Sequence, residues 1–124
     1  MRVLIVEGDP GLGKVWANHL RRAGHDVVLM PDAAAAIAAM GAPAPDMILA
    51  DLDLPESGAL SVADYAAYRH PAAKVVFVTA SRFFSDGSIF ELSANACAFL
   101  PSSTAPEDIA IVVEFHSSQS AGGG

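Results

Sequence analysis

Two short, continuously apolar segments constrain the fold of this chain more than any other feature of its sequence. Met47–Ala50 and Val75–Val78 are too short for buried helices, and they lack the alternation of polar and apolar residues that marks a half-exposed strand. Such runs are typical of strands buried on both faces of a parallel sheet. The first run leads directly into Asp51, and Pro55 stops regular structure soon afterwards. We therefore expect Asp51 at the carboxyl end of a central strand, with a turn or helix-capping aspartate as the alternative.

Strand and helix signals alternate along the whole chain. The segments expected to form strands are Arg2–Val6, Asp26–Met30, Met47–Ala50, Lys74–Val78 and Ala98–Leu100. The segments expected to form helices run from about Leu12 to a stop at Gly24, from Pro31-Asp32 to Met40, from beyond Gly58 to about His70, over Ile89, Phe90 and Leu92, and from Pro106 to about His116. The small and polar residues 117–124 are expected to be a disordered tail.

Strands that alternate with helices five times imply βαβ units with right-handed crossovers. We therefore predict an α/β fold: a single flavodoxin-like (βα)5 doubly wound domain over residues 1–116. Its five-stranded parallel sheet should have the strand order 2-1-3-4-5. A length of 124 residues suits one domain of this kind and is too short for two.

The composition excludes several classes of protein. With 14 acidic and 7 basic residues the net charge is -7, which argues against direct nucleic-acid binding, because phosphate contacts need clustered lysine and arginine. No apolar run approaches the roughly 20 residues that cross a bilayer, and the first strand meets acids too early for a secretory signal. The single cysteine, Cys97, can form no internal disulfide, which fits a reducing compartment. We expect a soluble, cytoplasmic protein without a membrane partner.

Polar residues are predicted to gather at one edge of this sheet. The first and third strands flank the point where the strand order reverses, so the residues after them should face each other across one crevice. The residues expected there are Glu7, Gly8 and Asp9 after the first strand, Asp51 and Asp53 after the third, and Thr79 and Ala80 after the fourth. Carboxylates this close raise each other's pKa or recruit a cation, and oxygen ligands with room for water suit Mg²⁺.

Six segments match one known family in their order and near-family spacing. They are Val3–Glu7 with Asp9-Pro10, Gly24–Val27, Pro45–Leu49 running into Asp51–Pro55 and Gly58, Val75–Ala80, Asn95–Leu100, and Pro106–Asp108. With these segments the chain resembles the receiver (CheY-like) domain of two-component response regulators. The resemblance extends from Met1 to about His116, and it is the combination of segments that is specific.

The resemblance implies a phosphorelay function in which Asp51 is the phosphoacceptor. Asp51 would attack a phosphohistidine of a sensor histidine kinase or phosphotransfer protein and form an acyl phosphate. Glu7 would hold Mg²⁺ through water, and the backbone carbonyl of Asp53 would be a further ligand. The positions implied to contact the phosphoryl group or to respond to it are Thr79, Ala80, Phe99 and Ser102. A receiver of this kind acts on a downstream protein target and is not itself an enzyme.

Two positions depart from the family pattern. Gly8 stands where the family has a second acid that binds Mg²⁺ directly, and Ser102 stands where it has a lysine that bonds the phosphoryl group. Losing either group weakens the stabilisation of transferring phosphoryl charge, so we expect weak or absent Mg²⁺ binding and slow phosphorylation. Asp9 is a candidate replacement for the acid, and Lys14 or Arg82 for the lysine; the alternative for Asp9 is a helix cap.

Two other interpretations remain open from the sequence. The first is an atypical receiver that no longer accepts phosphate and serves as a protein-interaction or dimerisation module. The second is a phosphate-binding P-loop at Gly8–Lys14, although Val15 stands where a serine or threonine must reach Mg²⁺. The adjacent Phe83 and Phe84 favour an exposed patch, and we expect a homodimer through the last two helices and the last strand.

Overall fold

The computed structural model describes residues 1–41, 43–80 and 95–122, with the side chains of 117–122 excepted. The strands are β1 (Arg2–Val6), β2 (Asp26–Met30), β3 (Met47–Asp51), β4 (Lys74–Thr79) and β5 (Ala96–Pro101). The α-helices within these ranges are α1 (Pro10–Arg22), α2 (Ala33–Ala39), α3 (Gly58–Arg69) and α5 (Pro106–Gly122), and a short 3₁₀ helix, η1, spans Pro55–Ser57. The expected short helix over Ile89, Phe90 and Leu92 lies outside the described residues.

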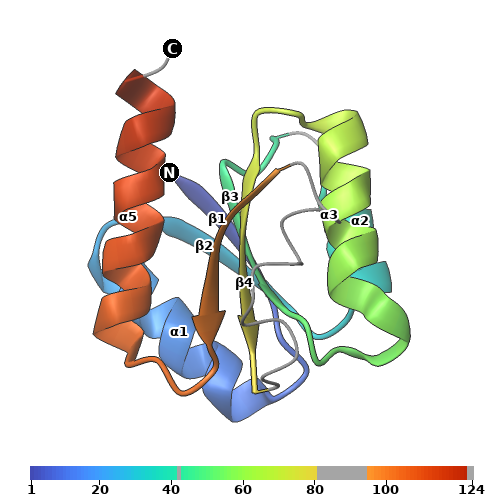
Figure 1. Cartoon of the computed structure of the whole chain (residues 1–124), viewed down its shortest axis with the longest axis horizontal. Coiled ribbons are helices and arrows are strands. Elements are labelled where there is room, and N and C mark those ends of the chain that lie inside the picture. The colour runs from blue at the N-terminus through green and yellow to red at the C-terminus, as the bar shows by residue number, and fades with distance from the viewer. Residues whose placement is uncertain (42, 81–94, 123–124) are drawn as a thin grey trace.

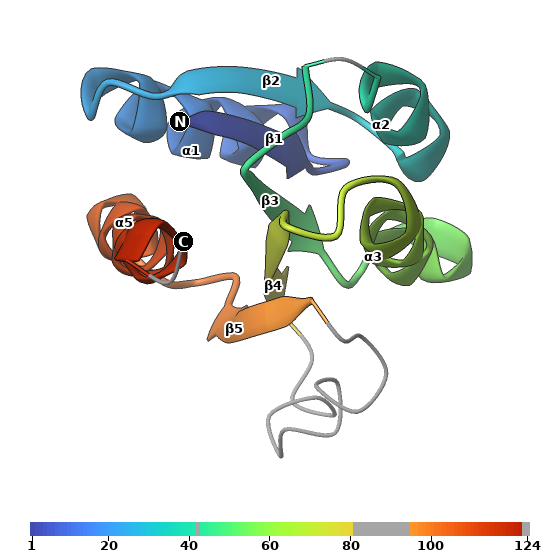
Figure 2. The ribbon, with the colours of Figure 1, turned by 90° about the horizontal axis from the view of Figure 1, so that it is seen from above.

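The strands form one parallel sheet in the order β2-β1-β3-β4-β5, which confirms the predicted fold class and strand order. The helices α1 and α5 cover one face of this sheet, and α2 and α3 cover the other (Figures 1 and 2). The register places Val6 beside Ala50 in the pair β1 and β3. The residues that directly follow these two positions, Glu7 and Asp51, are therefore brought together by backbone pairing alone.

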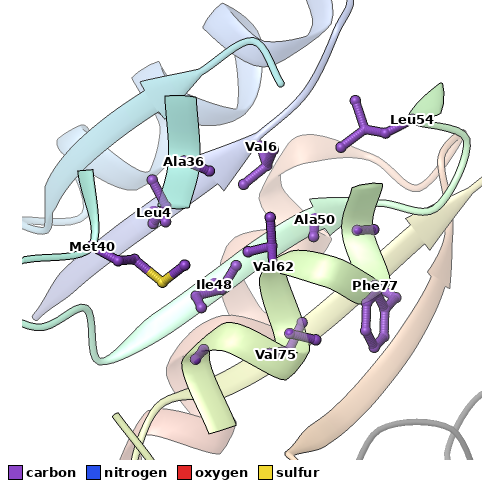
Figure 3. Close-up of a cluster of buried hydrophobic side chains, with 13 residues drawn as sticks. Leu4, Val6, Ala36, Met40, Ile48, Ala50, Leu54, Val62, Val75 and Phe77 are labelled. Carbon is purple, nitrogen blue, oxygen red and sulfur yellow. The ribbon is translucent and has the colours of Figure 1, made fainter. Parts of the chain in front are cut away.

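Alternate residues of the central strands enter two separate hydrophobic cores. Leu4 and Val6 of β1 pack with Phe77 of β4 against α2 and α3 (Figure 3), whereas Val3 and Ile5 pack with Trp16 against α1 and α5. Because side chains alternate across a strand, a strand that is apolar at every position feeds both cores at once. This is why the uninterrupted apolar runs of the sequence indicated a sheet with helices on both faces.

Two features of α1 explain residues that the sequence singled out. Asp9 is the N-cap, with a side-chain oxygen accepting from the backbone N–H groups of Gly11 (2.9 Å) and Leu12 (3.2 Å). A Cβ on Gly13 would lie 2.8 Å from a methyl carbon of Leu29, so glycine at this position permits close packing of α1 on β2. Because α1 already begins at Pro10, residues 10–14 are helical, which argues against a P-loop over Gly8–Lys14.

The last helix is longer than the sequence predicted. We expected it to end at about His116 and residues 117–124 to be a disordered tail, but α5 runs to Gly122. Residues 117–121 contain no proline or glycine, and adding a residue to an existing helix avoids the cost of nucleation. No helix in the described part of the chain is long and apolar enough to cross a membrane.

Candidate functional site

Glu7 and Asp51 form the centre of the site, at the carboxyl ends of β1 and β3. Glu7 is 4 % exposed, and its Oε1 accepts a hydrogen bond from the backbone N–H of Asp9 at 2.9 Å. Asp51 is partly buried, and its Oδ1 accepts from the backbone N–H of Asp53 at 2.8 Å. Both carboxyl groups are therefore fixed by the first residues of the loops that follow their own strands.

The burial of these two groups changes their protonation. Burial raises the pKa of Glu7 from 4.5 to about 7, against the opposing N–H of Asp9, and the neighbouring Asp51 raises it as well. Burial also raises the pKa of Asp51, against the opposing effects of the Asp53 N–H and of the neighbouring Glu7. Both shifts favour protonation, so this pair of carboxyl groups holds a proton to a higher pH than isolated carboxylates do.

The hydrogen bonding of one oxygen of this pair indicates whether the site suits a metal. The buried Oε2 of Glu7 has no hydrogen-bond partner among the described residues. A buried anionic oxygen without a partner is costly, and a cation beside Asp51 would relieve it. No set of three or more His, Cys, Asp or Glu side chains is grouped to hold a metal within the described ranges. The donors present fit Mg²⁺, which keeps several waters and uses one or two carboxylates.

Asp9 and Gly8, which follow Glu7, are the other positions that bear on metal binding. The side chain of Asp9 caps α1, which is the alternative to a metal ligand that the sequence left open. Gly8 is exposed, and a Cβ there would meet Leu54 at 3.6 Å and the carbonyl oxygen of Pro31 at 3.8 Å, which are ordinary contacts. Packing therefore does not require a glycine at position 8. What this position lacks, compared with the family pattern, is a carboxylate.

Thr79 and Ala80, at the end of β4, form the second half of the site. Thr79 is buried and follows Val78, which pairs with Asp51. Its hydroxyl donates to Oδ1 of Asp53 at 3.0 Å, and the backbone N–H of Ala80 donates to Oδ2 at 2.7 Å. The sequence placed Asp53 at this edge of the sheet and assigned its backbone carbonyl to the metal; the structure shows in addition that its side chain joins the loop after β3 to the end of β4.

The residues predicted from β5 lie at different depths of the site. The backbone N–H of Ser102 donates to the carbonyl oxygen of Thr79 at 2.8 Å, so Ser102 belongs to the same edge of the sheet. Phe99 is partly buried, lies opposite Phe77 in the strand register, and packs against the core under α3. Arg82, the candidate replacement for the missing lysine, lies outside the described residues.

The role of the Asp53 side chain was the main feature that sequence reasoning missed. Its only sequence signal is that an acid stands two residues after Asp51, beside a strand that ends in a hydroxyl and a small residue. The predicted strand order already places β3 beside β4 and so brings Asp53 and Thr79 to one edge of the sheet, as the structure confirms. A predicted sheet order alone could have suggested the contact but could not orient the side chain.

Comparison with known proteins places the domain in a family. The family model described as the response regulator receiver domain matches residues 3–114. A search of curated proteins finds no match. A CheY-like receiver domain protein from Methanospirillum hungatei JF-1 is similar in structure, with a TM-score of 0.88, 23% identity, and coverage of 99% of this chain and 98% of that chain.

Two further solved structures share the fold. The N-terminal domain of a response regulator/sensory box/GGDEF 3-domain protein from Carboxydothermus hydrogenoformans has a TM-score of 0.83 at 24% identity, covering 99% of this chain and 98% of that chain. TrrA from Thermotoga maritima, solved in complex with Mg²⁺-BeF, has a TM-score of 0.78 at 17% identity, covering 92% and 96%. The sheet order, the residues at its carboxyl edge and the family match over residues 3–114 agree, and the chain belongs to the response regulator receiver domain family.

Proposed function

We propose that this receiver domain accepts a phosphoryl group on Asp51 from a sensor histidine kinase or a phosphotransfer protein. The observation that carries the proposal is the convergence of Glu7, Asp51, Thr79 and the Ala80 N–H at one edge of the sheet. An oxygen of the Asp51 carboxylate attacks phosphorus, the P–N bond to the donor imidazole breaks, and an acyl phosphate forms on Asp51. The imidazole leaves as a neutral group after it takes a proton.

Three groups of this chain would act on the transferring phosphoryl group. Asp51 supplies the nucleophile, and the Thr79 hydroxyl and Ala80 N–H are donors for phosphoryl oxygens on the far side of the crevice. Glu7, Asp51 and the backbone carbonyl of Asp53 are the groups that would hold Mg²⁺, which when bound supplies positive charge that stabilises the transferring group. With Gly8 and Ser102 in place of an acid and a lysine, we expect the reaction to be slow.

Small phosphoryl donors test this proposal without knowledge of the kinase. We expect incubation with phosphoramidate or acetyl phosphate and Mg²⁺ to add one phosphoryl mass, measured by intact-protein mass spectrometry. The adduct should be lost in Asp51→Asn and reduced by EDTA, while Asp64→Asn, an exposed aspartate of α3, should label like the wild type. An adduct of equal size in Asp51→Asn would overturn the assignment of the acceptor.

A second candidate function is a phosphorylation-independent module that binds a downstream protein or a second copy of the chain. It is favoured by the exposed Gly8, which removes a metal ligand, and by Ser102 at the position of the lysine. On α5, Ile111 and Phe115 expose 62% and 56% of their surface, which suits an apolar contact. The absence of any adduct, together with a melting temperature that Mg²⁺ does not change, would favour this function.

Adding a carboxylate at position 8 is expected to strengthen Mg²⁺ binding by at least about tenfold. An ionised side chain close to the cation contributes more than the ~1.4 kcal/mol that a tenfold change requires, even when solvent screens the interaction. The Gly8→Asp variant adds this group at a position with ordinary space for a Cβ, and Gly8→Ala is the matched control for backbone and bulk. Isothermal titration calorimetry with MgCl₂ measures the affinities. Equal affinities of the aspartate and alanine variants would show that the cation binds elsewhere.

A further inference from the structure

The side chain of Asp53 occupies donors that the proposed function assigns to the phosphoryl group. Its two carboxylate oxygens take one donor each, at 3.0 Å from the Thr79 hydroxyl oxygen and 2.7 Å from the Ala80 nitrogen. The acceptor of both bonds is a carboxylate, the bond from the Ala80 N–H is short, and the two bonds together fix the orientation of the carboxylate. Two oxygens of a phosphoryl group on Asp51 would need the same pair of donors.

The backbone around Asp53 makes this contact intramolecular and preorganised. The N–H of Asp53 donates to Asp51 Oδ1 at 2.8 Å, and the N–H of Leu52 donates to the carbonyl oxygen of Val78 at 2.8 Å. The N–H of Leu54 donates to the carbonyl oxygen of Asp51 at 3.2 Å, so the loop after β3 is anchored on both sides of the Asp53 side chain, which has only two rotatable bonds. Little conformational entropy is lost when the carboxylate docks, so the contact persists without any external ligand.

The exposure of the same groups shows that the contact can be exchanged. Asp53 and Ala80 are exposed, whereas Thr79 is buried, with 2% of its surface exposed. The carboxylate can therefore rotate into water, where it is fully solvated, while the Thr79 hydroxyl and the Ala80 N–H stay in place at the end of β4. An incoming phosphoryl group could then take the two donors.

We propose that the Asp53 carboxylate is an internal ligand of the phosphoryl-binding position and competes with phosphorylation of Asp51. This inference rests on the proposed function of Asp51 as the acceptor. The internal carboxylate is a regulatory device built into the loop after β3: it holds the Thr79 hydroxyl and the Ala80 N–H in the absence of phosphate. The slow chemistry expected from Gly8 and Ser102 is slowed further by this competition.

Labelling rates of two Asp53 variants test the proposal. We expect phosphoramidate to label Asp53→Ala about tenfold faster than the wild type, because two hydrogen bonds to a charged group no longer compete. Asp53→Asn should be intermediate, since its amide oxygen can still accept one of the two bonds. If Asp53 acted only through its charge, these two variants would be labelled at equal rates. If its contact served only to hold the folded site together, both variants would be labelled more slowly than the wild type. Asp64→Asn again controls for net charge.

A second measurement does not depend on phosphorylation. In a proton–nitrogen NMR spectrum, the Ala80 amide proton of the wild type should be shifted downfield by its bond to a carboxylate and should move upfield in Asp53→Ala. The same spectrum shows whether each variant is folded. If the wild type is labelled but Asp53→Ala is no faster, the inference is overturned and the proposed function stands. If no variant is labelled, the proposed function fails, and an unchanged Ala80 shift would also overturn the internal contact.

Discussion

Replacing Glu7 with glutamine is expected to raise the free energy of unfolding of the metal-free domain at pH 8 by about 1–3 kcal/mol. Burial raises the pKa of Glu7 to about 7, so the folded state holds a proton more tightly than the unfolded chain, in which the pKa is 4.5. The stability that this proton contributes is fully present below pH 4.5 and is lost as the pH rises through 7. Glutamine keeps an acceptor for the Asp9 N–H, adds a donor toward Asp51, and carries no charge.

The measurement is urea unfolding in EDTA at several pH values between 4.5 and 8. The difference in unfolding free energy between Glu7→Gln and the wild type should grow over this range and level off above pH 7. Glu56→Gln, which alters an exposed carboxylate of η1, is the control and should give a nearly constant difference. A pH-independent difference for Glu7→Gln would show that Glu7 has the same pKa in the folded and unfolded states and would contradict its raised pKa.

Replacing Phe77 with alanine is expected to lower the free energy of unfolding by about 3–5 kcal/mol. Phe77 is fully buried in β4, where it packs beneath α3 among the residues of Figure 3. Its removal leaves a cavity in a sheet that is fixed by pairing on both sides, so the site can relax only partly. A domain of this length has a stability of roughly 6–15 kcal/mol, so the variant should fold but with much of its stability lost.

Urea denaturation measures this loss through a lower midpoint at an unchanged slope. Tyr68→Ala is the matched control, because it removes an aromatic ring from α3 that is 82% exposed and should change stability by less than about 0.5 kcal/mol. A loss below about 1 kcal/mol for Phe77→Ala would contradict the packing described here. Since β4 also carries Thr79, the variant should in addition label more slowly at temperatures near its unfolding transition.

Short apolar runs, together with the turn-forming residues that separate them, were sufficient to predict the sheet. The positions of β1 and β2 agree with the predicted residues, and β3 and β4 each extend one residue beyond the prediction. β5 is longer than predicted, at Ala96–Pro101, because pairing with β4 recruits residues without a strong strand preference. The extension of α5 to Gly122 has the same origin, since propagation of an existing element is less demanding than its initiation.

The sequence by itself determined the strand order, the two cores and the identity of the acids at the carboxyl edge, because periodicity and chain connectivity are local properties. Only the tertiary structure decided how these acids are used. It placed Asp9 on the helix N-terminus, raised the pKa of Glu7 by burial, and turned the Asp53 carboxylate onto Thr79 and Ala80. These outcomes depend on burial and on hydrogen-bond directions between strands distant in sequence, and neither quantity can be read from residue spacing.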